Sequence, residues 1–239
     1  MRIDKLLAHT GYGSRKDVKR LLKNKVVTVD GKVISKANVH VDPERQQVLV
    51  NGEKVVYEKY IYLMLNKPQG YLSATYDASG STILDLVPEK YRHYSLSPVG
   101  RLDKNTEGFI LLTNDGLLNH LITSPKNNIY KTYFAIISGK VTDAHIEQFK
   151  KGIQLDDNYI TSPAYLEILK SDDISEVNLS ISEGKFHQVK RMFQAIDMKV
   201  KYLKRWKIGD IVLDKNLDLG ELRPLNEKEM NYIHSLKNE

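Results

Sequence analysis

The sequence predicts an α+β protein with a small basic N-terminal domain and a larger domain built on a mixed sheet. Charge is uneven: residues 1–25 hold eight Lys and Arg against two Asp, so their net charge of +6 equals that of all 239 residues. Helical and strand patterns alternate irregularly in the remainder, which contains no internal repeat. With 41% hydrophobic residues, the chain can bury one substantial core and a small second one.

The first two predicted elements are short helices. Apolar residues at i, i+3 and i+4 predict a helix from Ile3 that ends at the Gly-Tyr-Gly of residues 11–13. Ser14 and Asp17 form an S-x-x-D start for a second helix, whose buried face begins at Val18. Both helices are therefore expected to pack one face on a small core.

The outer face of the second helix is basic. Four cations follow one another at i, i+3, i+4 and i+7: Lys16, Lys19, Arg20 and Lys23. The alternative is an ordinary solvated helix face, but the whole net charge gathers at this end. We therefore expect a polyanionic partner, and nucleic acid rather than an anionic membrane, because the sequence offers no large apolar face for insertion.

Short strands are expected to complete the N-terminal domain. They lie at residues 26–29, 32–34 and 48–50, and Asp30-Gly31 and Asn51-Gly52 mark tight turns. A polar linker follows near residues 58–60 and divides the chain into expected domains at 1–58 and 61–239.

The second domain is expected to alternate strands and helices without a regular order. Its predicted strands lie at residues 62–65, 109–112, 132–138, 164–169, 177–181, 200–203 and 211–213, and its predicted helices at 117–122, 142–151, 186–196 and after an Asn226-x-x-Glu229 cap. Phe186, Val189 and Phe193 are expected to share the buried stripe of the helix at 186–196.

Several classes of function lack the residues they need. The chain has no cysteine, and its His residues form no H-x-x-x-H pair, so a metal site is not expected. Phosphate-binding and serine-hydrolase motifs are also missing. No apolar run or N-terminal signal predicts membrane insertion or export, so a soluble cytoplasmic protein is expected.

Carboxylates are the remaining candidates for chemistry. Asp103 lies on a loop that enters the apolar strand at 109–112, and Arg101 lies two residues before it. The pair could be a structural salt bridge or part of a catalytic site. Glu107, four residues after Asp103, could complete a glycosidase-like pair. Residues 185–207, which hold eight Lys and Arg against one Asp, favour a second nucleic-acid-binding surface.

Residues 1–58 resemble the S4 RNA-binding domain, a small α-L fold. The matching pieces are Arg2-x-Asp4-Lys5-x-Leu7, Gly13-Ser14-Arg15 and Val29-Asp30-Gly31. The resemblance implies that this domain grips structured RNA through phosphates and shape. The residues implied in RNA binding are Arg2, Lys5, Ser14, Arg15, Lys16, Lys19, Arg20 and Lys23.

The second domain resembles the pseudouridine synthases, and within them the RsuA type that modifies small-subunit ribosomal RNA. The matching pieces are Asn66-Lys67-Pro68-Gln69-Gly70-Tyr71, Gly100-Arg101-Leu102-Asp103, Thr106-Glu107-Gly108, Ile122-Thr123-Ser124-Pro125, Lys131-Thr132-Tyr133, the run from Ile181 to Phe193, Gly209, and Gly220-Glu221-x-Arg223-Pro224-Leu225. A mixed, mainly antiparallel sheet with flanking helices is implied.

The reaction that this resemblance implies breaks the N1–C1′ bond of a uridine and rejoins the uracil through C5. It needs no cofactor and no metal. Asp103 is implied as the catalytic carboxylate, which either attacks C1′ or removes a sugar proton. Lys190 is implied as the cation beside it, with Arg191 as a neighbour on the substrate. Because uracil can leave as a delocalised anion, Glu107 is expected to be structural.

Three further residues are implied in handling the base. Tyr133 is expected to stack on the flipped uracil and to assist proton removal at C5. Arg101 is expected to fill the space that the extruded uridine leaves. Lys67, with Pro68, is expected to shape the pocket.

The implied partner is 16S ribosomal RNA, naked or in an assembling small subunit, bound by a monomer. Three alternatives stay open: a synthase for 23S RNA of the large subunit, a non-catalytic S4-type assembly factor, and a DNA-binding helix-turn-helix protein.

Overall fold

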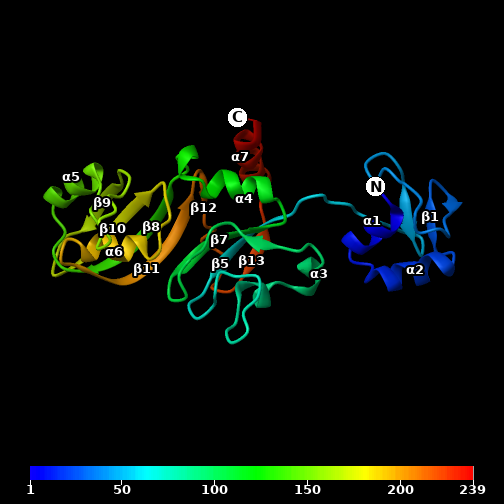
Figure 1. Ribbon diagram of the computed structural model, residues 1–239, viewed down its shortest axis with the longest axis horizontal. Coiled ribbons are helices and arrows are strands. Elements are labelled where there is room, and N and C mark those ends of the chain that lie inside the picture. Colours follow the sequence, from blue (N-terminus) through cyan, green and yellow to red (C-terminus); the bar gives the residue numbers. More distant parts are fainter. Residues whose placement is uncertain (239) are drawn as a thin grey trace. The chain divides into compact units, whose positions relative to one another are not determined.

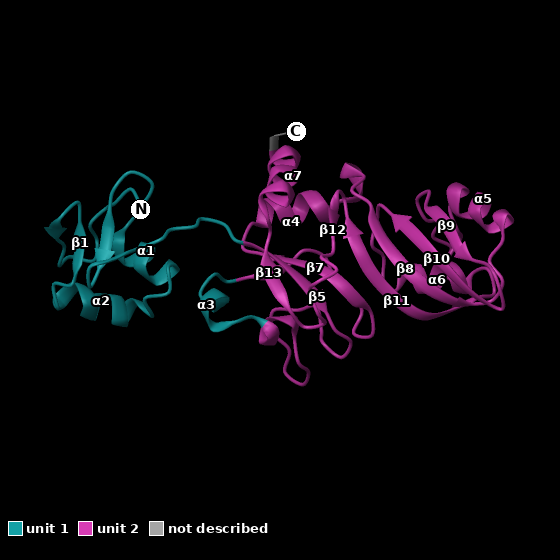
Figure 2. Ribbon diagram, turned by 180° about the vertical axis from the view of Figure 1, so that it is seen from behind, with its two compact units in different colours: residues 1–61, 87–95 teal, residues 62–86, 96–239 magenta. Residues whose placement is uncertain are grey.

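The computed structural model describes residues 1–238 and divides the chain into two compact units (Figure 1, Figure 2). Unit 1 comprises residues 1–61 and 87–95, and unit 2 comprises the remainder. Both units combine helices with β-structure, so the predicted α+β class is confirmed. The functional division at residues 58–61 stays a prediction.

Unit 1 places two helices on a small sheet. Helix α1 (Ile3–His9) and helix α2 (Arg15–Lys23) precede a sheet of order β2-β1-β3-β4. The strands are β1 (Val27–Val29), β2 (Lys32–Val33), β3 (Val48–Val50) and β4 (Glu53–Lys54), and a short helix, α3 (Glu89–Arg92), also belongs to the unit. The apolar residues that predicted both helices are buried in one core with the strands.

The predicted start of α2 is confirmed by its hydrogen bonds. The hydroxyl of Ser14 accepts from the backbone N–H of Asp17 at 3.3 Å, and the Asp17 carboxylate accepts from the backbone N–H of Ser14 at 3.0 Å. This reciprocal capping satisfies donors that would otherwise have no partner in the first turn.

Unit 2 contains a mainly antiparallel sheet of order β13-β5-β7-β11-β8-β10-β9, with β6 beside β7 and β12 beside β11. Its strands are β5 (Tyr62–Lys67), β6 (Ser97–Pro98), β7 (Glu107–Thr113), β8 (Lys131–Ser138), β9 (Tyr165–Lys170), β10 (Ile174–Ile181), β11 (Lys199–Ile208), β12 (Ile211–Val212) and β13 (Leu222–Pro224).

Strands β7 and β11 join the two halves of this sheet by a short parallel pairing. Gly108, with φ of +103°, lies in that pairing, and a Cβ there would be 2.1 Å from the carbonyl oxygen of Arg205. Only glycine lets the two backbones approach so closely. The loop that carries Asp103 enters β7 directly before this junction, so the junction sets its position.

Helices flank both halves of the sheet. Helix α4 (Gly116–Thr123) lies beside α7 (Glu227–Asn238), and both contribute to a core with β5 and β7 (Figure 1). Helix α5 (Asp143–Lys151) packs on β9 and α6 (Gln188–Gln194) on β11. Single 3-10 turns occur at Ile83–Leu86 and Pro125–Asn127. No helix within residues 1–238 is both long and apolar enough to cross a membrane.

The predicted helix at 186–196 is wrong at its start. Helix α6 begins at Gln188, because His187 adopts a left-handed conformation with φ of 49° that ends any regular helix on its N-terminal side. Val189 and Phe193 are buried as expected, but Phe186 is 76% exposed. Strand β11 is also longer than predicted, and β4, β6 and β13 were not predicted.

Candidate active site

The loop that carries Asp103 is fixed on both sides of that residue. Leu102 is buried, and its backbone N–H and C=O both bond to the hydroxyl of Ser73, at 3.0 and 2.9 Å. Thr106, also buried, closes the turn by donating its backbone N–H to the carbonyl of Asp103 at 3.0 Å. The Asp103 carboxylate is therefore presented from a rigid backbone.

Lys67 holds the same loop from within the fold. Its side chain is fully buried, and its ammonium group donates to the carbonyls of Pro68, Asp103, Lys104 and Thr106 at 2.9–3.3 Å. Burial lowers the pKa of Lys67 to about 8. The side chain contacts the backbone of the loop and is absent from the residues that line the cavity described next.

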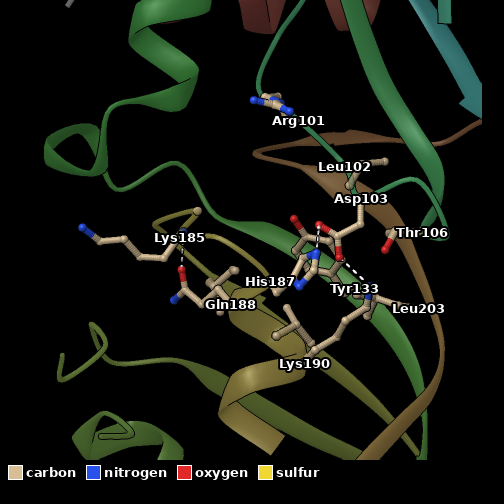
Figure 3. Close-up of a pocket in the computed structure, with 13 residues that line it drawn as sticks. Arg101, Leu102, Asp103, Thr106, Tyr133, Lys185, His187, Gln188, Lys190 and Leu203 are labelled. Carbon is tan, nitrogen blue, oxygen red and sulfur yellow. Dashed lines mark hydrogen bonds and ion pairs between the residues drawn. The ribbon is translucent and has the colours of Figure 1, made fainter. Parts of the chain in front are cut away.

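An open cavity of about 60 Å³ lies beside Asp103 (Figure 3). Tyr133 of β8 and Leu203 of β11 line it together with Asp103, and Lys190 of α6 faces them. Lys190 Nζ donates to Asp103 Oδ2 at 2.6 Å and to Asn105 Oδ1 at 2.8 Å. The structure thus brings together the three residues predicted as catalytic.

His187 is a further polar residue at this cavity. Its Nε2 lies 3.7 Å from Asp103 Oδ1, the carboxylate oxygen on the other side from Lys190 (Figure 3). His187 lies within the run from Ile181 to Phe193 that resembles the family, but no role was predicted for it. The signal that could have found it is its place three residues before Lys190, next to a basic segment.

A buried carboxylate organises the segment that carries His187. Glu183 is 3% exposed and accepts from the hydroxyl of Tyr159 at 2.7 Å, from Nε2 of Gln188 at 2.6 Å, and from both the backbone N–H and the hydroxyl of Ser162. Gln188 in turn accepts from the backbone N–H of Lys185 at 2.8 Å. These bonds fix residues 183–188, and sequence reasoning did not single out Glu183.

Arg101 does not pair with Asp103. Arg101 is an exposed residue that lines the cavity, and its side chain points away from the Asp103 carboxylate (Figure 3). The carboxylate forms its ion pair with Lys190 instead. The salt-bridge alternative for the Arg-x-Asp pair is therefore not what the structure contains.

Arg191 and Glu107 lie outside the cavity lining. Arg191 pairs with the carboxylates of Asp156 and Asp157, which raise the pKa of its guanidinium group. Glu107 accepts from the hydroxyl of Tyr202 at 2.6 Å. Burial, and then that bond, raises the pKa of Tyr202. Glu107 thus bonds to a side chain of β11, which is the kind of contact expected of a structural residue.

The residues predicted to bind RNA lie on unit 1. Arg15, Lys16, Lys19, Arg20 and Lys23 are exposed on α2, and Lys5 is exposed on α1. Arg2 donates two hydrogen bonds to the buried carboxylate of Asp4, and they lower the pKa of Asp4. Ser14 caps α2. Their contacts with RNA stay predictions.

Metal chemistry was not expected from the sequence. Within residues 1–238, no three His, Asp or Glu side chains gather in a group that could hold a metal ion.

Comparisons with known proteins decide the family. The sequence profile described as RNA pseudouridylate synthase matches residues 61–195, more than half of the chain. The chain belongs to the RNA pseudouridylate synthase family. A second profile, described as the S4 domain, matches residues 1–46. The two resemblances seen in the sequence are therefore confirmed.

Similar proteins match the chain over nearly its whole length. An RNA pseudouridine synthase of Bacillus subtilis named YtzG is 46% identical over 98% of both chains. Ribosomal small subunit pseudouridine synthase A of Escherichia coli K12 is 40% identical over 96% of this chain and 98% of the relative. A solved pseudouridylate synthase structure matches with a TM-score of 0.67 and 38% identity over 99% of both chains.

The protein is thus a pseudouridine synthase, an isomerase that acts on RNA. This excludes the non-catalytic assembly factor and the helix-turn-helix alternative, because family membership covers the second domain as well as the first.

Proposed function

We propose that this protein converts one uridine of 16S ribosomal RNA to pseudouridine, with Asp103 as the catalytic carboxylate acting on a base flipped into the cavity. The observation that carries the proposal is the Asp103–Lys190 ion pair at the cavity lined by Tyr133. The 16S target is supported by 40% identity to relatives that are named small-subunit synthases.

The geometry fits the chemistry of the reaction. The N1–C1′ bond of the uridine breaks, the uracil turns, and C5 bonds to C1′ while the proton leaves C5 and N1 gains one, so no atom of the substrate is lost. A single carboxylate at the sugar is enough, since uracil spreads its charge over two carbonyls. Asp103 supplies that carboxylate, and Tyr133 lies in the same cavity to stack on the turning base.

The surrounding residues take supporting roles in this proposal. Lys190 holds the Asp103 carboxylate in position by donating to one of its oxygens. Lys67 fixes the loop from within the fold. Arg101, exposed at the rim, fills the gap that the extruded uridine leaves in the RNA. Arg191, which is paired with two aspartates, lies next to the RNA backbone.

The S4 domain delivers the enzyme to its RNA in this proposal. Exposed cations of α2 contact phosphates and contribute affinity without reading sequence. We further propose that the protein acts as a monomer in the cytoplasm, on 16S RNA or on an assembling small subunit.

Mapping pseudouridines in ribosomal RNA tests the proposal. Carbodiimide adducts are read by primer-extension stops in cells with the gene, without it, and with Asp103→Asn. We expect one 16S stop to disappear in the last two strains. A 16S pattern that is identical in all three would contradict the assignment, and loss of a 23S stop alone would favour the large-subunit alternative.

A further inference from the structure

An aromatic side chain that the fold leaves exposed follows Lys185 and precedes His187, two residues that line the cavity. Phe186 is 76% exposed, whereas the apolar residues that follow it on α6, Val189 and Phe193, are buried. Its ring stacks on that of His187, with centroids 3.8 Å apart and planes inclined by 20°. The opposite face of the Phe186 ring is left for solvent.

This arrangement is fixed by the surrounding backbone. The left-handed conformation of His187 turns the chain before α6 begins, so Phe186 leaves the buried stripe. Gln188 accepts from the backbone N–H of Lys185 and donates to the buried Glu183, and Arg191 donates to the carbonyl of Phe186 at 3.5 Å. The exposed ring therefore belongs to a backbone segment that these hydrogen bonds hold in place.

The stack reaches the catalytic carboxylate through His187. The imidazole of His187 contacts both residues: its ring stacks on Phe186, and its Nε2 lies 3.7 Å from Asp103 Oδ1. A nucleotide next to a uridine whose sugar lies at Asp103 could therefore meet the Phe186 ring.

The segment that carries the ring is basic in sequence. Lys185, Lys190 and Arg191 lie within five residues of Phe186; Lys190 is paired with Asp103 and Arg191 with Asp156 and Asp157, whereas the Lys185 ammonium lies over the Tyr159 ring. A single exposed apolar side chain is ordinary on a protein surface and would make a poor protein-docking patch. An aromatic ring amid cations is the combination by which proteins hold unpaired bases, because every base offers a π-face.

We propose that Phe186, backed by His187, is a stacking site for the nucleobase next to the uridine that is isomerised. The site adds affinity for RNA whose bases are splayed apart at the target and does not itself take part in bond breaking. The inference depends on the RNA activity of the family and holds for a 16S or a 23S target.

Steady-state kinetics of Phe186 variants test this inference. Full-length enzyme acts on unmodified 16S and 23S transcripts tritiated at uridine C5, and tritium release measures turnover. Phe186→Leu keeps an apolar side chain but removes the aromatic face, and we expect its KM to rise about tenfold with kcat nearly unchanged. Phe186→Tyr and Phe186→Trp should stay close to the wild type.

Tyr165→Ala is the matched control. Tyr165 is also an exposed aromatic residue, 57% accessible on β9, but its ring partner, Tyr130, does not line the Asp103 cavity, whereas His187, the ring partner of Phe186, does. Its loss should leave KM unchanged. A wild-type KM for Phe186→Leu, or an equal rise for Phe186→Tyr and Phe186→Leu, would overturn the inference.

A fluorescent base gives a second readout. A synthetic RNA with 2-aminopurine beside the reacting uridine is bound to the Asp103→Asn enzyme, and stacking on Phe186 should quench its emission. Adding Phe186→Leu should remove the quenching, and quenching that persists would refute the site. A failure of the 16S proposal can be told apart, because the wild-type enzyme would then release tritium from the 23S transcript alone. The Phe186 variants would in that case be compared with the wild type on the 23S transcript.

Discussion

Lys190 Nζ lies 2.6 Å from Asp103 Oδ2, although 87 positions separate the two residues in the chain. Asp103 precedes β7 and Lys190 belongs to α6, which packs on β11. The parallel pairing of β7 with β11 joins these two halves of the sheet. The ion pair thus depends on the junction at the centre of the sheet.

Removing the Lys190 ammonium should slow the chemical step. The pair is only partly exposed, with 26% of the Lys190 and 24% of the Asp103 side chain accessible, so water replaces the lost contact poorly. We expect Lys190→Met to lower kcat about 10- to 100-fold, and Lys190→Arg to lower it less. Single-turnover tritium release measures the effect.

Lys185→Met is a matched control for that variant. Lys185 also lines the cavity, but its ammonium lies over the Tyr159 ring, 4.5 Å from the centroid. An equal loss of kcat in both variants would mean that overall positive charge, rather than the contact with Asp103, supports the reaction.

Lys67→Met should loosen the loop that carries Asp103. Four backbone carbonyls would lose their buried donor, at a cost of about 3 kcal/mol in the free energy of unfolding. We expect a lower melting temperature together with a lower kcat. Lys104→Met, which changes an exposed side chain on the same loop, should alter neither, and calorimetry with tritium release compares the two.

Gly108→Ala should disrupt the junction between the two halves of the sheet. Its new Cβ would meet the Arg205 carbonyl at 2.1 Å, so the strands must separate, and we expect more than about 3 kcal/mol of lost stability. Gly116→Ala, at the first residue of α4, meets no atom within 4 Å and should be neutral or slightly stabilising. Similar melting temperatures for both variants would show that the junction tolerates a side chain.

Local patterns in the sequence predicted much of the fold. Helix α2 was predicted through Ser14 and Asp17 because a capping box is encoded within four residues. The start of α6 was not, because the left-handed turn at His187 comes from a network anchored on Glu183, which bonds to residues more than 20 positions away. Periodicity carries no information about such contacts.

The candidate site was predicted unevenly for the same reason. Motif resemblance brought together Asp103, Tyr133 and Lys190, whereas composition alone left Asp103 as a possible salt-bridge partner of Arg101. The loop-holding contacts of Lys67 and the placement of His187 depend on long-range packing, which no single segment reveals.

Neutralising part of the basic face of α2 should weaken RNA binding. Lys19→Gln with Lys23→Gln removes two exposed cations, so we expect a lower affinity and a salt slope reduced by about 1.5. Filter binding to a 16S transcript over a range of salt concentrations measures both. Lys32→Gln with Lys54→Gln makes the same charge change on β2 and β4, and an identical slope change there would indicate non-specific attraction.

Lys131 should make the stability of the protein depend on pH. It is 7% exposed, and burial, reinforced by Arg205, lowers its pKa from 10.5 to about 8. Below pH 8 both the folded and the unfolded chain carry the proton, whereas between about pH 8 and 10.5 only the unfolded chain does. The unfolding free energy therefore rises with pH in that window. The unfolding free energy of the wild type, measured by urea unfolding relative to that of Lys131→Met, should increase by up to about 3 kcal/mol from pH 8 to 10.5. The same comparison with Lys140→Met, which changes an exposed lysine, should show no such trend. If the difference in unfolding free energy between the wild type and Lys131→Met does not change with pH, the pKa of Lys131 is not lowered.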